Sequence, residues 1–234
     1  MDSYYNYIFD DFMCRVGGEI RANSSNVVRW WPIDDVRIIV ELSDGNYYKY
    51  DSILKDCKVS RRLHELLIFE IPNENSWRIK FSNSLYRYII KSGYTQDMLS
   101  LEARVSTGSI SMYVNADRTP NIYILLRLAR TTDCKLKDII TLLCINRECD
   151  NDRINYLYLD DEDEWVFEFS HRLKRILRKN NYSQKTLAEI LSISNASSCR
   201  YLNGQSTPSS YIIHKIIKIF DLSVNEIKQL LGLE

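Results

Sequence analysis

Apolar residues recur through most of the chain at intervals of three and four positions, the spacing that places side chains on one face of an α-helix. Two long helices are predicted most clearly. Their apolar positions are Trp77, Phe81, Leu85, Tyr88 and Ile89 in one and Trp165, Phe169, Leu173, Ile176 and Leu177 in the other. Shorter helical patterns follow each of them, so the chain after residue 75 is expected to be helical.

Residues 1–75 have a different pattern. Positions 4–14 have the spacing of one amphipathic helix, which Gly17 and Gly18 would end. The β-branched and aromatic runs at 27–31, 36–42 and 46–50 then predict strands. Asp44-Gly45 between two of these runs predicts a hairpin, because glycine accepts the positive φ of a tight turn. Pro32 indicates a strand end or an edge, so we expect a small α+β unit with a three-stranded antiparallel sheet.

The helical part of the sequence occurs twice, 88 residues apart. Residues 77–143 align with residues 165–231 without a gap, with 21 identities at 67 positions. Ordinary composition would give about four identities by chance. A period this long that occurs only twice indicates a duplicated domain.

Hydroxyl residues occupy the positions where short helices should begin, and their oxygens can accept from unpaired backbone N–H groups. These residues are Thr95 and Ser106 in the first copy and Ser183 and Ser194 in the second. Ser223 with Glu226 forms a capping box for the last helix. The first copy has Lys135 and Asp138 there, so its last helix is expected to be less well capped.

Two matching stretches resemble the helix-turn-helix of the phage Cro/repressor (XRE) family. They are YTQDMLSLEARVSTGSISMYVNADRTP at 94–120 and YSQKTLAEILSISNASSCRYLNGQSTP at 182–208. Each contains the family's Thr/Ser-Gln opening, a short turn and an Asn-containing end before Thr-Pro. The resemblance implies a mainly α protein with two tandem five-helix, lambda-repressor-like helix-turn-helix domains after the small α+β domain. The expected limits are 1–75 for the α+β domain, 76–143 and 165–234 for the helix-turn-helix domains, and 144–164 for an acidic linker.

The resemblance also implies which residues meet DNA. In the second copy the outward positions of the recognition helix are Asn195, Ala196 and Arg200, which suit adenine, a thymine methyl group and guanine. The matching Thr107 and Met112 of the first copy offer mainly apolar contacts. The residues expected at the DNA backbone are Gln184, Ser194, Ser197 and Asn203 in the second copy and Gln96, Ser106 and Asn115 in the first. Asparagine near a helix end can also act only as a local cap.

The copies depart from the family at two places. The turn between their second and third helices often carries glycine, but here it carries Arg104 and Ser192, which predicts strain or a different turn shape. The inward position of the recognition helix is Ile110 in the first copy and Ser198 in the second. The serine is expected to cost on the order of 1–2 kcal/mol of apolar burial unless a neighbour fills the space.

Several functions are not expected from the composition of the chain. The six cysteines are scattered without a CxxC pair, so neither a metal site, a cofactor nor a disulfide framework is expected. His64, His171 and His214 accompany no nucleophile motif, and no catalytic residue is predicted; the protein is not expected to be an enzyme. The lack of a long apolar run and of a leader sequence favours a reduced cytoplasmic protein without membrane contact.

Charge is unevenly distributed although it sums to zero. Residues 144–168 carry 2 basic and 9 acidic side chains, whereas residues 169–234 carry 10 basic and 4 acidic ones. This asymmetry points weakly to a polyanionic partner of the second copy. A solvated surface of mixed sign would explain the charge pattern equally well.

These observations predict a sequence-specific regulator that binds double-stranded DNA, a repressor of phage or bacterial type that reads the major groove mainly with its second copy. The first copy could read a flanking half-site or serve in packing or dimerisation, and a homodimer is favoured. The alternative is a phage-type inhibitor, such as an anti-CRISPR protein, that binds a host protein through residues 1–75 and represses its own promoter. RNA binding is a third interpretation, which no aromatic RNA-binding motif supports.

Overall fold

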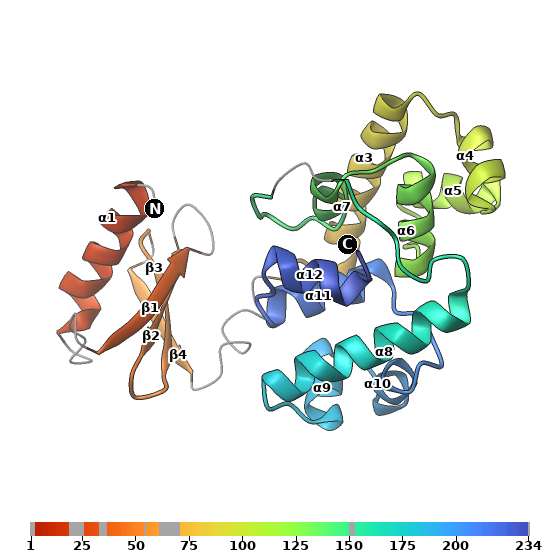
Figure 1. The fold of residues 1–234 in the computed structure, drawn as a ribbon. Coiled ribbons are helices and arrows are strands. Elements are labelled where there is room, and N and C mark those ends of the chain that lie inside the picture. The colour runs from red at the N-terminus through yellow and green to blue at the C-terminus, as the bar shows by residue number, and fades with distance from the viewer. Residues whose placement is uncertain are drawn as a thin grey trace. The chain divides into compact units, whose positions relative to one another are not determined.

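The computed structural model describes residues 3–18, 26–32, 37–53, 55–60, 71–149 and 153–233. The chain divides into two compact units, residues 1–70 and residues 71–234. Figure 1 shows a helix and a small sheet in the described part of the first unit and a set of helices in the described part of the second.

The described residues of the first unit form a helix, a π-helical turn and an antiparallel sheet. Helix α1 (Ser3–Phe12) runs on into a π-helical turn (Met13–Gly17), so the helical segment ends at the glycine pair that was expected to end it. The strands lie in sheet order β1 (Val27–Pro32), β2 (Arg37–Leu42), β3 (Tyr47–Asp51) and β4 (Asp56–Ser60). The expected hairpin is confirmed between β2 and β3.

The hairpin turn has the conformation that its sequence predicts. Gly45 has a φ of +81°, which strains most other residues. The Asp44 carboxylate accepts a hydrogen bond from the Asn46 backbone N–H at 2.9 Å. Pro32 is the last residue of edge strand β1, which agrees with the strand end or edge that its missing N–H predicts.

The expectation of three strands was wrong, because β4 pairs with β3 as a fourth strand. This strand escaped the sequence pattern because it lies at the sheet edge. Lys58 and Val59 are both exposed, so β4 lacks the alternation of apolar and polar residues that marks a half-buried strand.

The aromatic residues of the sheet mostly pack inward. Tyr48 and Tyr50 are buried with Phe12 of α1, and the Phe9 ring stacks on Trp30 at 4.9 Å. A folded core therefore accounts for most of these aromatic side chains without a partner protein.

The second unit contains both copies of the repeat. The first copy consists of α3 (Glu74–Ser92), α4 (Gln96–Ala103), α5 (Thr107–Val114), α6 (Ile122–Thr131) and α7 (Leu136–Leu142). The second consists of α8 (Glu162–Lys179), α9 (Gln184–Leu191), α10 (Asn195–Leu202), α11 (Ser210–Ile219) and α12 (Val224–Leu231). The fold class expected from the sequence is confirmed.

The predicted helix starts are also confirmed. The hydroxyls of Thr95, Ser106, Ser183 and Ser194 each accept from the backbone N–H three residues further on. Ser223 and Glu226 form the complete capping box of α12. At α7 only half of this arrangement exists, because Asp138 accepts from the Lys135 backbone N–H but the lysine side chain has no acceptor atom.

The segment expected to be an acidic linker is partly built into the fold. Asp161 caps α8 by accepting from the N–H groups of Asp163 and Glu164, and helix α8 begins at Glu162. Acidic side chains in a first turn are favoured by the helix dipole, so these residues do more than solvate a connection. Ile145 and Leu159 within the same segment are buried.

The two copies pack against each other around one continuous core. Helix α11 of the second copy contacts both α3 and α6 of the first, and Asn121 and Ser209 form an isolated β-bridge. The sequence left open whether the copies stand apart or pack together. Within the second unit they pack together.

Candidate nucleic-acid interface

Each copy presents a pair of short helices joined by a tight turn, α4–α5 in the first and α9–α10 in the second. The turns begin at Arg104 and Ser192, whose φ angles of 52° and 53° lie in the left-handed region. The turn shape that glycine favours is therefore kept with two other residues. Each costs roughly 1–2 kcal/mol of backbone strain.

Helix α10 is fixed by its inner face. Ser198 and Leu202 are buried, and the Ser198 hydroxyl donates to the backbone carbonyl of Gln184 at 3.1 Å. This hydrogen bond ties α10 to the first turn of α9. It offsets part of the apolar burial that is lost relative to Ile110, because the buried hydroxyl is satisfied.

The outer face of α10 carries the expected reading residues. Asn195, Ala196 and Arg200 are all exposed, at the start of the helix and one turn later. Ala196 and Arg200 lie opposite the buried Ser198 on the helix, and Asn195 is exposed because it is the first residue of α10. A helix held this way can present these side chains to a groove without disturbing its own packing.

The first copy presents a different surface at the same positions. Ile110 and Tyr113 of α5 are buried, whereas Thr107 and Met112 are exposed. These two side chains have methyl groups where the second copy has an amide and a guanidinium. The structure thus places both candidate sets outward, with unequal chemistry.

The predicted backbone-contacting residues surround these helices. Gln184 is exposed at the first position of α9, and Gln96 is half-buried at the first position of α4. Ser194 and Ser106 are occupied as N-caps, and Ser197 shares a hydroxyl contact of 2.9 Å with Ser194.

The two asparagines make local contacts. Asn203 donates to the Cys199 sulfur at 3.2 Å, and Asn115 donates to the Ser111 hydroxyl at 3.3 Å. Both side chains are exposed. Both bonds join two side chains, so neither satisfies a backbone group in the way that the local-cap interpretation expected.

Sequence reasoning missed two charged differences at this surface. Lys185 follows Gln184 on α9, but its equivalent in the first copy is Asp97, and Gln205 is likewise replaced by Asp117. All four side chains are exposed. The 88-residue alignment contained this signal, and it makes the second copy the more attractive to phosphate.

The family comparison agrees with this geometry. A helix-turn-helix family model matches residues 85–139 and again residues 173–227. These segments are offset by the same 88 residues as the repeat and contain both helix pairs with their turns. The chain therefore contains two helix-turn-helix domains in tandem.

This family, of the XRE type, is one of DNA-binding transcription regulators and is not a family of enzymes. No curated protein and no solved structure gives a significant match to the chain.

In both helix-turn-helix domains a half-buried cation contacts the end of the helix that precedes the turn. Arg127 donates to the Ala103 carbonyl at the end of α4, and Lys215 donates to the equivalent Leu191 carbonyl at the end of α9. Burial lowers the pKa of Lys215. A positive group at the carbonyl end of a helix offsets its dipole and helps to hold the turn in place.

The basic first helix of the second domain is only partly available to a partner. Arg172 packs over Trp165 with its guanidinium carbon 5.9 Å from the ring centre, and burial lowers its pKa. Lys179 pairs with Glu226. Arg175 and Arg178 are exposed.

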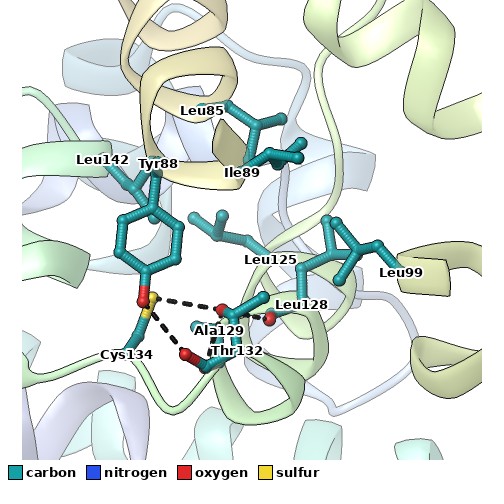
Figure 2. Close-up of a pocket in the computed structure, with 10 residues that line it drawn as sticks. All are labelled: Leu85, Tyr88, Ile89, Leu99, Leu125, Leu128, Ala129, Thr132, Cys134 and Leu142. Carbon is teal, nitrogen blue, oxygen red and sulfur yellow. Dashed lines mark hydrogen bonds between the residues drawn. The ribbon is translucent and has the colours of Figure 1, made fainter. Parts of the chain in front are cut away.

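The first domain contains a small internal hollow below α3 (Figure 2), with a volume of about 10 Å³. A hollow of this size holds at most one water molecule. Tyr88 and Cys134 lie at one end, where the Tyr88 hydroxyl donates to the Thr132 carbonyl at 3.2 Å. Burial raises the pKa of the Cys134 thiol to about 12, so this thiol stays protonated and unreactive.

Among the described residues no cluster of histidine, cysteine, aspartate or glutamate could hold a metal ion. In the same part of the chain no helix has the length and apolar character needed to cross a membrane.

Proposed function

We propose that this tandem helix-turn-helix protein is a transcriptional repressor of phage or bacterial type that binds a specific double-stranded DNA sequence. The observation that carries the proposal is the outer face of α10. It exposes Asn195, Ala196 and Arg200 on a helix whose inner face is tied to α9 through Ser198.

In the proposed complex α10 lies in the major groove. Arg200 donates two hydrogen bonds to a guanine, Asn195 pairs with the edge of an adenine, and Ala196 contacts a thymine methyl group. These three contacts supply sequence discrimination.

The start of α9 lies against the phosphate backbone in the same complex. Gln184 donates to a phosphate oxygen, and the nearby Lys185 adds a positive charge. Ser194, Ser197 and Asn203 contact the backbone on either side of the reading face. These contacts orient α10 without reading bases.

The test uses the selected binding sequence of the full-length protein. Arg200→Ala should weaken specific binding by ~1–3 kcal/mol and relax the preference at one base pair. Binding is measured by fluorescence anisotropy with specific and scrambled duplexes at two salt concentrations. Met112→Ala, at the equivalent position of the first domain, is the matched control and should cost less.

An Arg200→Ala protein that keeps wild-type affinity and base preference would show that α10 is not the reading helix. Repression is tested separately, by placing the selected sequence within the promoter of a reporter gene. Expression should fall when the protein is present and recover with Arg200→Ala.

One observation favours the alternative of a protein that inhibits a host factor. The first domain exposes Leu101 by 81%, Ile90 by 60% and Met98 by 47%. The second domain has Glu189, Arg178 and Thr186 at these positions. Exposed apolar residues of this kind suit a protein partner.

The substitutions Leu101→Glu and Ile90→Arg separate the two functions, because they transfer the second domain's own surface residues. Under the inhibitor hypothesis they abolish nuclease-resistant binding of a host protein and leave DNA binding intact. Under the repressor hypothesis no such binding is present to be lost.

A further inference from the structure

The contact between the two domains is reciprocal. The Ile122 N–H donates to the Pro208 carbonyl, and the Ser210 N–H donates to the Pro120 carbonyl, each at 3.0 Å. Pro120 and Ile122 are the equivalents of Pro208 and Ser210 at the 88-residue offset. Exchanging the two domains therefore maps each hydrogen bond onto the other, as in the two-fold contact of a homodimer.

The aromatic contacts repeat the same symmetry. Trp77 lies 5.5 Å from Tyr211 with an interplanar angle of 51°, and the equivalent pair Trp165 and Tyr123 lies at 6.0 Å and 55°. The repetition extends the two-fold relation from the backbone bridge into the side-chain packing.

The two tyrosine hydroxyls extend the relation further. Tyr211 donates to the Pro72 carbonyl at 2.9 Å, and Tyr123 donates to the Leu159 carbonyl at 3.0 Å. Each acceptor lies shortly before the first helix of the opposite domain. Three kinds of contact thus obey one two-fold relation within a single chain.

The segment between the domains holds this arrangement in place. The Leu157 N–H donates to the Gly232 carbonyl at 2.9 Å, Arg130 pairs with Asp160 at 2.8 Å, and Arg147 pairs with Asp221. The face that could pair with a second chain is therefore occupied by the protein's own other half.

We infer that one chain occupies one DNA site composed of two inverted and unequal half-sites. This inference rests on the proposed function. Two recognition helices related by a two-fold axis match the local two-fold symmetry of duplex DNA only when the half-sites are inverted, about one helical turn apart. In the view of Figure 1, α5 lies above α10, and both lie to the right of α7 and α12.

The half-sites are unequal because the two recognition helices differ. Arg200 and Asn195 of α10 read guanine and adenine in the stronger half-site. Thr107 and Met112 of α5 contact thymine methyl groups in the weaker one. The exposed acidic Asp97 and Asp117 offset in number the exposed basic Arg104 and Arg118, which leaves this part of the first domain's surface nearly neutral. Its half-site therefore adds discrimination more than attraction.

The test is in-vitro selection with the full-length protein, followed by a count of chains per duplex by native mass spectrometry. The expected result is one chain on a site with two inverted, unequal halves. Arg200→Ala should relax the base preference of one half only, and Met112→Ala should relax that of the other.

A change in the DNA gives a second measurement that no folding defect can affect. Inserting about five base pairs between the half-sites turns one of them by half a helical turn. Affinity should fall by about 10–100-fold, to that of a duplex with the stronger half-site alone, because the tethered second contact is lost.

A selected site with one half only, two chains on the selected duplex, or an affinity unchanged by the insertion would overturn the inference and leave the proposed DNA binding intact. If no duplex is selected at all, the proposed function fails and this inference fails with it.

Discussion

At the scale of single residues, His214 shows most clearly how the two domains differ. It is buried at the contact between them, where Leu126 is its equivalent. Its Nδ1 lies 2.8 Å from the Leu143 carbonyl, and its buried Nε2 has no hydrogen-bond partner. A neutral ring that donates from Nδ1 fits this site, whereas a charged ring would bury an unpaired N–H.

The stability of the protein should therefore depend on the protonation of His214. Burial lowers the pKa of His214 from 6.5 to about 4 against the opposing effect of its hydrogen bond to the Leu143 carbonyl, and the positive charges of Lys218 and Lys80 contribute to the lowering. The unfolded chain takes up the proton first as the pH falls. This contribution is complete above pH 6.5 and is lost between pH 6.5 and pH 4, to the extent of about 3 kcal/mol.

Urea unfolding at a series of pH values between 7.5 and 4 measures this effect. His214→Leu, which installs the first domain's own residue, is the control. The difference in unfolding free energy between the two proteins should shrink or reverse as the pH falls. If the two pH profiles run parallel, His214 is not the group responsible.

At the scale of elements, the loop after each recognition helix has the same left-handed residue conformation, with glycine in one copy and alanine in the other. Gly204 has a φ of +66°, and a Cβ there would lie 3.0 Å from the Phe167 Cα. Ala116 occupies the equivalent position with a φ of +62°. The first domain bears the strain of a left-handed alanine at a position where the second has none.

Substitutions at these two positions should have opposite effects. Gly204→Ala should destabilise the protein by ~1–3 kcal/mol, because it adds both a strained φ and a contact with backbone that cannot easily move. Ala116→Gly should stabilise it by about 1 kcal/mol by releasing the same strain. Both values come from shifts in the urea midpoint at constant m-value, and destabilisation by both variants would contradict the explanation.

Sequence reasoning was most successful with these local elements. Helix starts at Thr95, Ser106, Ser183 and Ser194 could be predicted because a cap depends only on residues three positions apart. The hairpin at Asp44-Gly45 was predictable for the same reason. Strand β4 was not, because an exposed edge strand owes its pairing to its neighbour rather than to its own pattern.

At the scale of the whole molecule, the pairing of the domains could not be foreseen. Pro120 and Pro208 could be recognised in the sequence as parts of a repeated motif. Their proximity in space depends on contacts between residues 88 positions apart, which the sequence pattern does not reveal. Equally, Ser198 looked like a defect in the core, because its bond to the Gln184 carbonyl exists only in the folded arrangement. The candidate reading residues were predictable from the family motif, and their exposure agrees with it.

The shared core predicts that residues 71–234 unfold as one cooperative unit. Amide hydrogen exchange at increasing urea concentration measures the opening free energy of each helix. The most protected amides of α6 and α11 should converge on one value, since separating the domains would expose Trp77 and Trp165. A lower limiting opening free energy for the amides of one domain alone would indicate independent folding. Ser82 of α3 and Ser170 of α8 are buried at equivalent positions, so their amides are matched internal references.

The reciprocal bridge at Pro120 and Pro208 also affects how pairing of the two domains depends on protein concentration. Proteins that pair as separate chains lose their paired form when few copies are present, so the fraction paired depends on how much protein a cell makes. Here both partners are made together in one polypeptide, and their local concentration is fixed by the connecting segment. Every molecule therefore has its two domains paired, however few copies a cell makes.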